Sequence, residues 1–444
     1  MQNDNNAKVK LKIFNKKMEK LLNHDEKDYD TIPYRLELIK TLLDNKEVKP
    51  LFDPSDSSTE NFINDGDWKV DHLYKSDSIW EQYKLYHSEP NDNNLNSCHV
   101  LGKKTVDFGK TMMDIGGELI YKKSGSSGHT FRAKIKIGDK NNEQSIKYAV
   151  KVVPYLKNDI YGKIDDVRRP ENSELLMIKA LSRFVVKGET QHIVLPITCF
   201  NSNIKPFLNI EPKFVGKSKK YIEFQKRYKK GQYCNVASIL LSEWANAGDL
   251  LNFLKRRYLE LDLTHWKVIF FQLLSVLAII QNKYIKFRHN DLKANNILVH
   301  KINNKKKNVR YTINESVYIV PQVGYIIKLW DFDFACIPNK VDNFKVYAEW
   351  TDSINVRPIQ NRYYDVHYFF NTLINFIPEL TKNNLIPIEV KDFIKRVLPP
   401  KFRKEPFSND KGRLMVNQEF VTPEKILKED IFFSEYRRNK EGIK

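Results

Sequence analysis

The 444-residue chain lacks the features that mark membrane and secreted proteins. It has no run of about 18 apolar residues, so we expect no transmembrane segment. Its first ten residues are polar and contain no apolar signal-peptide core, so we expect that it is not secreted. The four cysteines are scattered and none is paired at metal-ligand or redox spacing, which is typical of a reducing compartment.

Acidic residues are also under-represented, with 55 Asp+Glu against 74 Lys+Arg and a net charge of +19. Such a surface favours anionic partners, either acidic proteins or other polyanions. The alternative is ordinary solubility in a Lys- and Asn-rich chain. The basic residues form no single block with interleaved aromatics, so nucleic acid is only a secondary candidate. The 41% hydrophobic content is enough for a large core in two or three domain-sized units.

One short polar stretch organises the rest of the chain. Residues 289–296 read H-x-D-L-K-x-x-N and precede the apolar run 297–299. This stretch resembles the catalytic loop of eukaryotic-type protein kinases. The resemblance implies that Asp291 accepts the proton of the attacking hydroxyl, Lys293 offsets charge on the γ-phosphate and Asn296 binds magnesium. His289 would be structural. The alternative is a polar turn before a buried strand, since Asn and Asp are common in turns.

Two patterns upstream resemble the nucleotide-binding parts of a kinase. Gly125 and Gly128 match the second and third glycines of G-x-G-x-x-G, with Lys123 at the first position. Glycine lets backbone N–H groups approach phosphates closely, although a Gly/Ser hairpin turn would look the same. Lys151 follows within Tyr-Ala-Val-Lys-Val-Val, which resembles the strand V-A-I-K. Lys151 would bind the α- and β-phosphates.

The partner of Lys151 is expected on the next helix, predicted over residues 173–181. Glu174 is the predicted partner and Glu171, one turn earlier, is the alternative. The stretch between Lys151 and this helix is longer than a minimal kinase needs, so an insertion is expected there.

Residues 238–250 resemble the fifth strand and hinge of a kinase. On that match, the backbones of Glu243 and Ala245 would hydrogen-bond adenine, Ser242 would be a small gatekeeper and Asp249 would reach the ribose. Without its neighbours, this stretch would be interpreted only as a strand and a turn.

A second acidic motif, Asp331-Phe332-Asp333, resembles the D-F-G magnesium motif with Asp in place of Gly. We assign Asp331 to magnesium, because otherwise it would be a costly carboxylate within an apolar strand. The long excursion between Asn296 and Asp331 predicts an inserted hairpin. Downstream, Asp365 begins a large helix and would hold the catalytic-loop backbone.

The expected A-P-E motif is absent, and Asn290 stands where many kinases have Arg. Without that cation no loop phosphate is needed to neutralise it. We therefore predict that Thr351 and Ser353, the favoured loop phosphosites, are dispensable for activity.

Together these motifs resemble the poxvirus-type serine/threonine kinases of large DNA viruses over roughly residues 115–440. The resemblance implies an α+β, bilobal protein-kinase-like fold with a small β-rich N-lobe, a trimmed and mostly helical C-lobe and an N-terminal accessory region. The expected boundaries are 1–112, 113–245 and 246–444. It also implies an ATP- and Mg²⁺-dependent protein serine/threonine kinase acting on protein substrates, among them viral structural proteins. Its expected locations are the host-cell cytoplasm and the virion.

Two other classes compete with this interpretation. A small-molecule kinase of the aminoglycoside phosphotransferase type would share the Asp/Asn pair, but Lys293 and the Asp331-Phe332 motif argue against it. A pseudokinase scaffold is favoured by the missing first glycine, the D-F-D motif and the missing A-P-E motif. Yet Lys151, Asp291, Asn296 and Asp331 are all present.

Three further segments carry weaker expectations. Residues 8–46 have helical periodicity, with Pro33 between two helices. The basic segment 201–235 is expected to be a loop-bearing insertion with a solvated charge run. Residues 374–444 are expected to form only a short helical tail.

Overall fold

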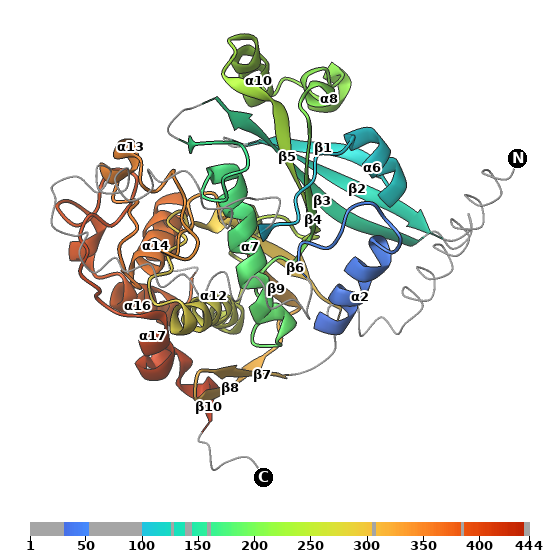
Figure 1. Ribbon diagram of the computed structural model, residues 1–444. Coiled ribbons are helices and arrows are strands. Elements are labelled where there is room, and N and C mark those ends of the chain that lie inside the picture. The colour runs from blue at the N-terminus through green and yellow to red at the C-terminus, as the bar shows by residue number, and fades with distance from the viewer. Residues whose placement is uncertain are drawn as a thin grey trace, which may run out of the picture. The chain divides into compact units, whose positions relative to one another are not determined.

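The computed structural model describes residues 31–52, 100–125, 128–137, 144–157, 161–303, 308–382 and 386–438. They form an α+β fold, as expected (Figure 1). The chain divides into two compact units. Unit 1 comprises Met1–Asp56, Leu95–Val167 and Leu195–Trp244, and unit 2 comprises Ser57–Asn94, Arg168–Val194 and Ala245–Lys444.

Unit 1 contains a five-stranded antiparallel sheet in the order β1-β2-β3-β5-β4. Along β2, buried residues alternate with more exposed ones, which is the pattern of a strand with one face on a core. The strands are β1 (Glu118–Ser124), β2 (His129–Ile137), β3 (Gln144–Leu156), β4 (Pro196–Asn203) and β5 (Tyr233–Glu243).

The N-terminal region of unit 1 packs along the edge strand β4. It contributes α2 (Ile32–Leu42) and α6 (Phe108–Ile115). The backbone N–H of Leu51 donates to the Ile197 carbonyl (3.1 Å), and Thr105 pairs with Asn201. This region therefore covers an edge that would otherwise expose unpaired backbone groups. Pro33 lies in the first turn of α2, where proline is tolerated, and the helix expected before it lies outside the described residues.

The basic segment 201–235 contains three helices that were not predicted, although its charge run is solvated as expected. It forms α8 (Lys205–Leu208), α9 (Pro212–Val215) and α10 (Lys219–Lys229). Ser218 caps α10 by accepting a hydrogen bond from the Tyr221 backbone N–H (3.3 Å). Tyr221 and Phe224, three residues apart, are buried while most of the lysines remain exposed. The helix forms because its apolar positions share one face.

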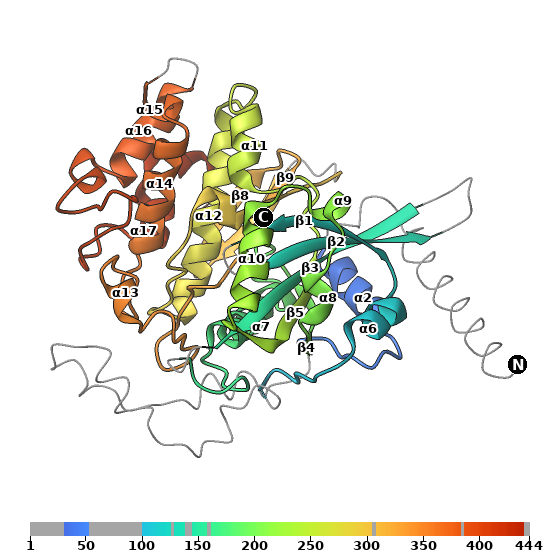
Figure 2. The ribbon, with the colours of Figure 1, turned by 90° about the horizontal axis from the view of Figure 1, so that it is seen from above.

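Unit 2 contains the 21-residue helix α12 (Leu263–Lys283), which is labelled in Figure 2. The middle of α12 is apolar on nearly all sides and buried. Asp262 caps it by accepting from the His265 backbone N–H (2.9 Å). Among the described residues, α12 is the one helix long and apolar enough to cross a membrane, but 78% of that window is buried in the structure. Other helices are α7 (Pro170–Val186), α11 (Leu250–Arg257), α13 (Glu349–Asp352) and α14 (Tyr364–Phe376).

Two small sheets complete unit 2. The strands β6 (Ile297–Lys301) and β9 (Tyr325–Leu329) form an antiparallel pair. Between them, β7 (Asn308–Ile313) and β8 (Ser316–Pro321) form the predicted inserted hairpin, extended by β10 (Arg437–Arg438).

The expectation that residues 374–444 form only a short helical tail was wrong. This segment forms α15 (Glu379–Lys382), α16 (Ile388–Val397), η4 (Pro400–Arg403), α17 (Pro423–Glu429) and η5 (Ile431–Tyr436). Phe393 of α16 and Phe432 of η5 stack with ring centroids 4.4 Å apart, and both rings are buried. The segment therefore contributes to the core of unit 2.

Candidate active site

The β6–β9 ladder brings two predicted magnesium-binding residues to one end of a sheet. Ile297 pairs with Leu329, and the next backbone N–H, that of Trp330, donates to the Asn296 carbonyl (3.2 Å). Asp331 follows directly and has a φ of +62°, in the left-handed region that few non-glycine residues adopt. Asp331 therefore lies just after the end of β9, and Asn296 lies just before the start of the paired strand β6.

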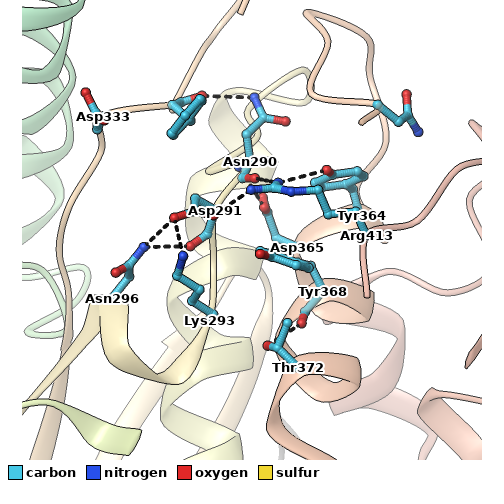
Figure 3. A network of polar contacts seen from close by, with 12 residues as sticks. Asn290, Asp291, Lys293, Asn296, Asp333, Tyr364, Asp365, Tyr368, Thr372 and Arg413 are labelled. Atoms are coloured by element: carbon cyan, nitrogen blue, oxygen red, sulfur yellow. Dashed lines mark hydrogen bonds and ion pairs between the residues drawn. The ribbon is translucent and has the colours of Figure 1, made fainter. Parts of the chain in front are cut away.

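The catalytic-loop residues predicted from the sequence converge on the Asp291 carboxylate (Figure 3). Lys293 Nζ lies 2.9 Å from Asp291 Oδ2, and Asn296 Nδ2 donates to the same oxygen at 2.9 Å. Asn296 also donates to the Asp291 backbone carbonyl (2.9 Å). Asp291 and Lys293 keep 13% and 25% of their side chains exposed, so the cluster is accessible to a substrate.

The backbone of this loop is held from α14, as predicted. The Asp365 carboxylate accepts hydrogen bonds from the backbone N–H groups of His289 (2.7 Å) and Asn290 (2.9 Å). Burial raises the pKa of Asp365, while His289, Arg288 and the two N–H groups act in the opposite direction. His289 is buried, lies 3.0 Å from the Trp330 carbonyl through Nε2 and packs on Phe332, which confirms its structural role.

Arg413 is a contact of Asp291 that reasoning from the sequence missed. Its Nη2 donates to Asp291 Oδ1 at 2.6 Å, and its Nη1 donates to the Asn290 carbonyl. Burial acts to lower the pKa of Arg413, but Tyr364, Tyr368 and Asp291 raise it above its ordinary value, so the guanidinium stays charged. No local spacing indicates this contact, because Arg413 lies 122 residues after Asp291.

Asp333, at the glycine position of the D-F-D motif, is held by an ion pair. Its Oδ2 lies 2.5 Å from Lys345 Nζ, and its backbone carbonyl accepts from Asn343 (2.9 Å). Contrary to expectation, Asp331 does not lie within an apolar strand, because β9 ends at Leu329. The assignment of Asp331 to magnesium therefore rests on the resemblance to the D-F-G motif and stays a prediction.

The glycine-rich turn and Lys151 lie in unit 1. Gly125 donates its backbone N–H to the Gly128 carbonyl (2.7 Å), closing the turn between β1 and β2. A Cβ added at Gly128 would lie 2.1 Å from the Val152 carbonyl oxygen. Glycine is therefore required here by the close approach of β3, whatever the turn binds. Lys151 lies on β3 and is 8% exposed.

The remaining predicted residues take defined positions. Both glutamate candidates lie on α7, and Glu171 lies 3.0 Å from Arg169 in a buried ion pair. The pairing of Lys151 with Glu174 stays a prediction. Ala245 is buried, and Asp249 caps α11 by accepting from the backbone and side-chain N–H groups of Asn252 (2.9 and 2.8 Å).

The side chain of Glu243 has a contact that the hinge resemblance did not predict. Arg35 of α2 donates to both of its oxygens, at 2.5 and 2.8 Å. Glu243 also accepts from the Leu195 backbone N–H (2.9 Å). The accessory region therefore contacts the residue predicted to present its backbone to adenine.

The two favoured loop phosphosites differ in accessibility. Thr351 is fully buried and its hydroxyl donates to the Ala348 carbonyl (2.6 Å), so it is a poor phosphosite in this fold. Ser353 is exposed and donates to the Trp350 carbonyl (2.9 Å).

A catalytic-loop acid with a lysine two residues later and an amide five residues later, beside an Asp-Phe motif, defines a protein kinase. Residues 163–435 match the family model described as poxvirus serine/threonine protein kinase. The chain belongs to this family and is a protein serine/threonine kinase.

Two relatives come from Acanthamoeba polyphaga mimivirus, and both carry the provisional name serine/threonine-protein kinase. One is 39% identical over 416 residues, covering 91% of this chain and 80% of the relative. The other is 26% identical over 274 residues, covering 52% of this chain and 67% of the relative.

Proposed function

We propose that the protein transfers the γ-phosphoryl group of ATP, with Mg²⁺, to serine and threonine hydroxyls of protein substrates. The observation that carries this proposal is the cluster of Asp291, Lys293 and Asn296, which share contacts of 2.9 Å at the Asp291 carboxylate. Asp331 lies at the end of the β6–β9 ladder where Asn296 also lies. An acid, a cation and two oxygen donors are the groups that phosphoryl transfer needs.

The donor set fits magnesium. Mg²⁺ prefers oxygen ligands, and the site offers the Asp331 carboxylate and the Asn296 amide oxygen. Asn296 uses its Nδ2 to contact Asp291, which leaves Oδ1 as the side-chain atom able to bind a cation. Asp331 is the proposed ligand because it lies just after β9 and Asn296 precedes the paired strand β6.

The chain's own residues would act by position and charge. Asp291 would orient the substrate hydroxyl and accept its proton. Lys293, fixed against Asp291, would offset charge on the transferred group. Bound ATP would supply the phosphoryl group, and Mg²⁺ would neutralise charge on the phosphates. Lys151 would bind the α- and β-phosphates, and the backbones of Glu243 and Ala245 would bind adenine.

The substrates that we propose are viral structural proteins, with the host-cell cytoplasm and the virion as the sites of action. The family and the mimivirus origin of two relatives support this proposal. The net charge of +19 would favour acidic protein segments near the phosphorylated residue. Acidic casein is therefore a suitable first acceptor. Higher kcat/KM on acceptor peptides with acidic flanks than on neutral ones would support this part, and equal values would contradict it.

The test is transfer from radiolabelled ATP to casein by purified protein with Mg²⁺. We expect Lys151→Met to reduce the rate by about 10²–10³ while the variant stays folded, because it removes one positioned charge. Lys147→Met is the matched control, since Lys147 lies on the same strand but is exposed. Lys147→Met should retain full activity.

Each alternative class predicts a different result. A pseudokinase would transfer no label to any acceptor under conditions where it binds the nucleotide. A small-molecule phosphotransferase would label an aminoglycoside and not casein. If Lys151→Met stayed within tenfold of wild type, the assignment of the nucleotide site would be wrong.

A further inference from the structure

Arg413 contacts the catalytic loop although it lies far from it in the sequence. It is 6% exposed and contacts two consecutive catalytic-loop residues, the Asn290 carbonyl through Nη1 and the Asp291 carboxylate through Nη2 (2.6 Å). Its guanidinium lies 4.4 Å from the Tyr368 ring centroid, and Nη1 lies 3.2 Å from the Tyr364 hydroxyl (Figure 3). The planar guanidinium thus has neighbours in its plane and on its face.

The backbone that carries Arg413 is fixed independently of Asp291. The Arg413 N–H donates to Asn409 Oδ1 (2.9 Å), and the Asn409 N–H donates to the Arg413 carbonyl (3.1 Å). Between them, Gly412 has a φ of +79°, and its carbonyl accepts from Asn371 of α14 (3.1 Å). A turn closed at both ends and bonded to a buried helix residue leaves the guanidinium little freedom to move.

The residue next to the catalytic acid supplies no charge here. Asn290 is fully buried, has a φ of +64° and donates its side-chain N–H to the Phe334 carbonyl (3.0 Å). Within the described residues, the basic groups in ion-pair contact with Asp291 are Lys293 and Arg413. Arg413 is the more buried of the two, with 7% of its side chain exposed against 25% for Lys293.

We propose that Arg413 is the positioning residue that holds the Asp291 carboxylate in its working orientation, and that this makes the site competent without loop phosphorylation. The inference rests on the proposed kinase function. The positive charge of Arg413 is already paired with Asp291, so no phosphate is needed to neutralise it. The burial of Thr351 agrees, because that hydroxyl is unavailable in this fold.

The test compares steady-state kinetics of wild type, Arg413→Met and Arg413→Lys. We expect Arg413→Met to lower kcat by roughly 10²-fold, since small displacements of a reacting group can cost this much. The KM for ATP should stay within twofold, because Arg413 touches no residue predicted to bind the nucleotide. Arg413→Lys should lose about tenfold, since one ammonium cannot bridge the Asn290 carbonyl and Asp291 together.

Arg396→Met is the matched control. Arg396 also forms an ion pair in unit 2, with Asp430 at 2.7 Å, but contacts no catalytic-loop residue in the structure. It should keep wild-type kcat. Wild type treated with a phosphatase, and the Thr351→Ala/Ser353→Ala double variant, should both keep kcat within threefold.

The outcomes separate the inference from the function on which it rests. Inactive wild type would overturn the proposed function itself. Active wild type with a folded Arg413→Met variant of unchanged kcat would overturn the positioning role. If Arg413→Met does not fold, an Arg413→Lys variant with wild-type kcat would overturn it equally. A loss of more than tenfold after phosphatase treatment would overturn the independence from phosphorylation.

Discussion

Removal of Arg35 should destabilise unit 1 and weaken ATP binding. Arg35 and Glu243 have 6% and 12% of their side chains exposed and share two contacts, of 2.5 and 2.8 Å. Arg35→Met removes a cationic partner of the Glu243 carboxylate, which also accepts from the Leu195 N–H. Breaking a buried ion pair by removing one partner costs about 3–5 kcal/mol.

The assay is differential scanning calorimetry, which records thermal unfolding and can resolve the separate transitions of a protein with two units. For a unit of 150–250 residues, about 2–4 °C are lost per kcal/mol, so the transition of unit 1 should fall by roughly 6–20 °C. Lys46→Met is the matched control, since its ion pair with Asp114 is 3.3 Å long and half-exposed. Such a pair contributes at most about 1 kcal/mol.

Two results would refute this reasoning. The first is an Arg35→Met variant that melts within 2 °C of wild type, which would mean that the pair contributes no more than an exposed one. The second is an Arg35→Met/Glu243→Gln double variant whose loss of stability equals the sum of the losses in the two single variants. The two residues would then be uncoupled, whereas an ion pair between them predicts that the double variant loses less than this sum. Below the transition, Arg35→Met should raise the KM for ATP severalfold, because Glu243 is the predicted adenine-binding residue.

Three further predictions concern two histidines, an ion pair and a glycine. Burial lowers the pKa of both His129 and His367 to about 4. The contribution of each histidine to the free energy of unfolding is therefore complete above pH 6.5 and is lost as the pH falls toward 4. Denaturant unfolding at pH 5 should show about 2 kcal/mol less stability per histidine than at pH 7, and equal stabilities would contradict this. Lys345→Met should lower the melting temperature, and adding Asp333→Asn should restore part of it, because only 15% and 13% of the two side chains are exposed. Gly128→Ala should cost about 1–3 kcal/mol in calorimetry, since its Cβ overlaps the β3 backbone.

The sequence predicts the parts of the site that are local in the chain. Asp291, Lys293 and Asn296 lie in one short loop, and the resemblance of this loop to a kinase catalytic loop predicts that they meet. The strand after Asn296 and the strand before Asp331 are both apolar runs, and the structure pairs them as β6 and β9. Asp365 was predicted from its place at the start of a helix and its expected role at the loop.

Contacts between distant residues could not be predicted in this way. Arg413 is one of 74 Lys+Arg residues, and no periodicity connects it with Asp291, 122 residues earlier. Arg35 and Glu243 are 208 residues apart. These pairs are set by tertiary packing, which no pattern within a short window records.

The missed helix α10 had a different cause. Tyr221 and Phe224 are spaced three residues apart, and Ser218 precedes them as a cap, so a helical signal was present. The many lysines around them are equally typical of a solvated loop. A charged segment can be an amphipathic helix when even two apolar side chains share a face, and the net charge alone does not reveal this.

The most direct test of the central claim is the rate of phosphotransfer to casein by Asp291→Asn, measured beside wild type at saturating ATP and Mg²⁺. The substitution keeps the size of the side chain but removes the charge on which Lys293, Asn296 and Arg413 converge. We predict an active wild type and a folded variant at least about 10²-fold slower. A folded Asp291→Asn variant within tenfold of wild type would contradict the account.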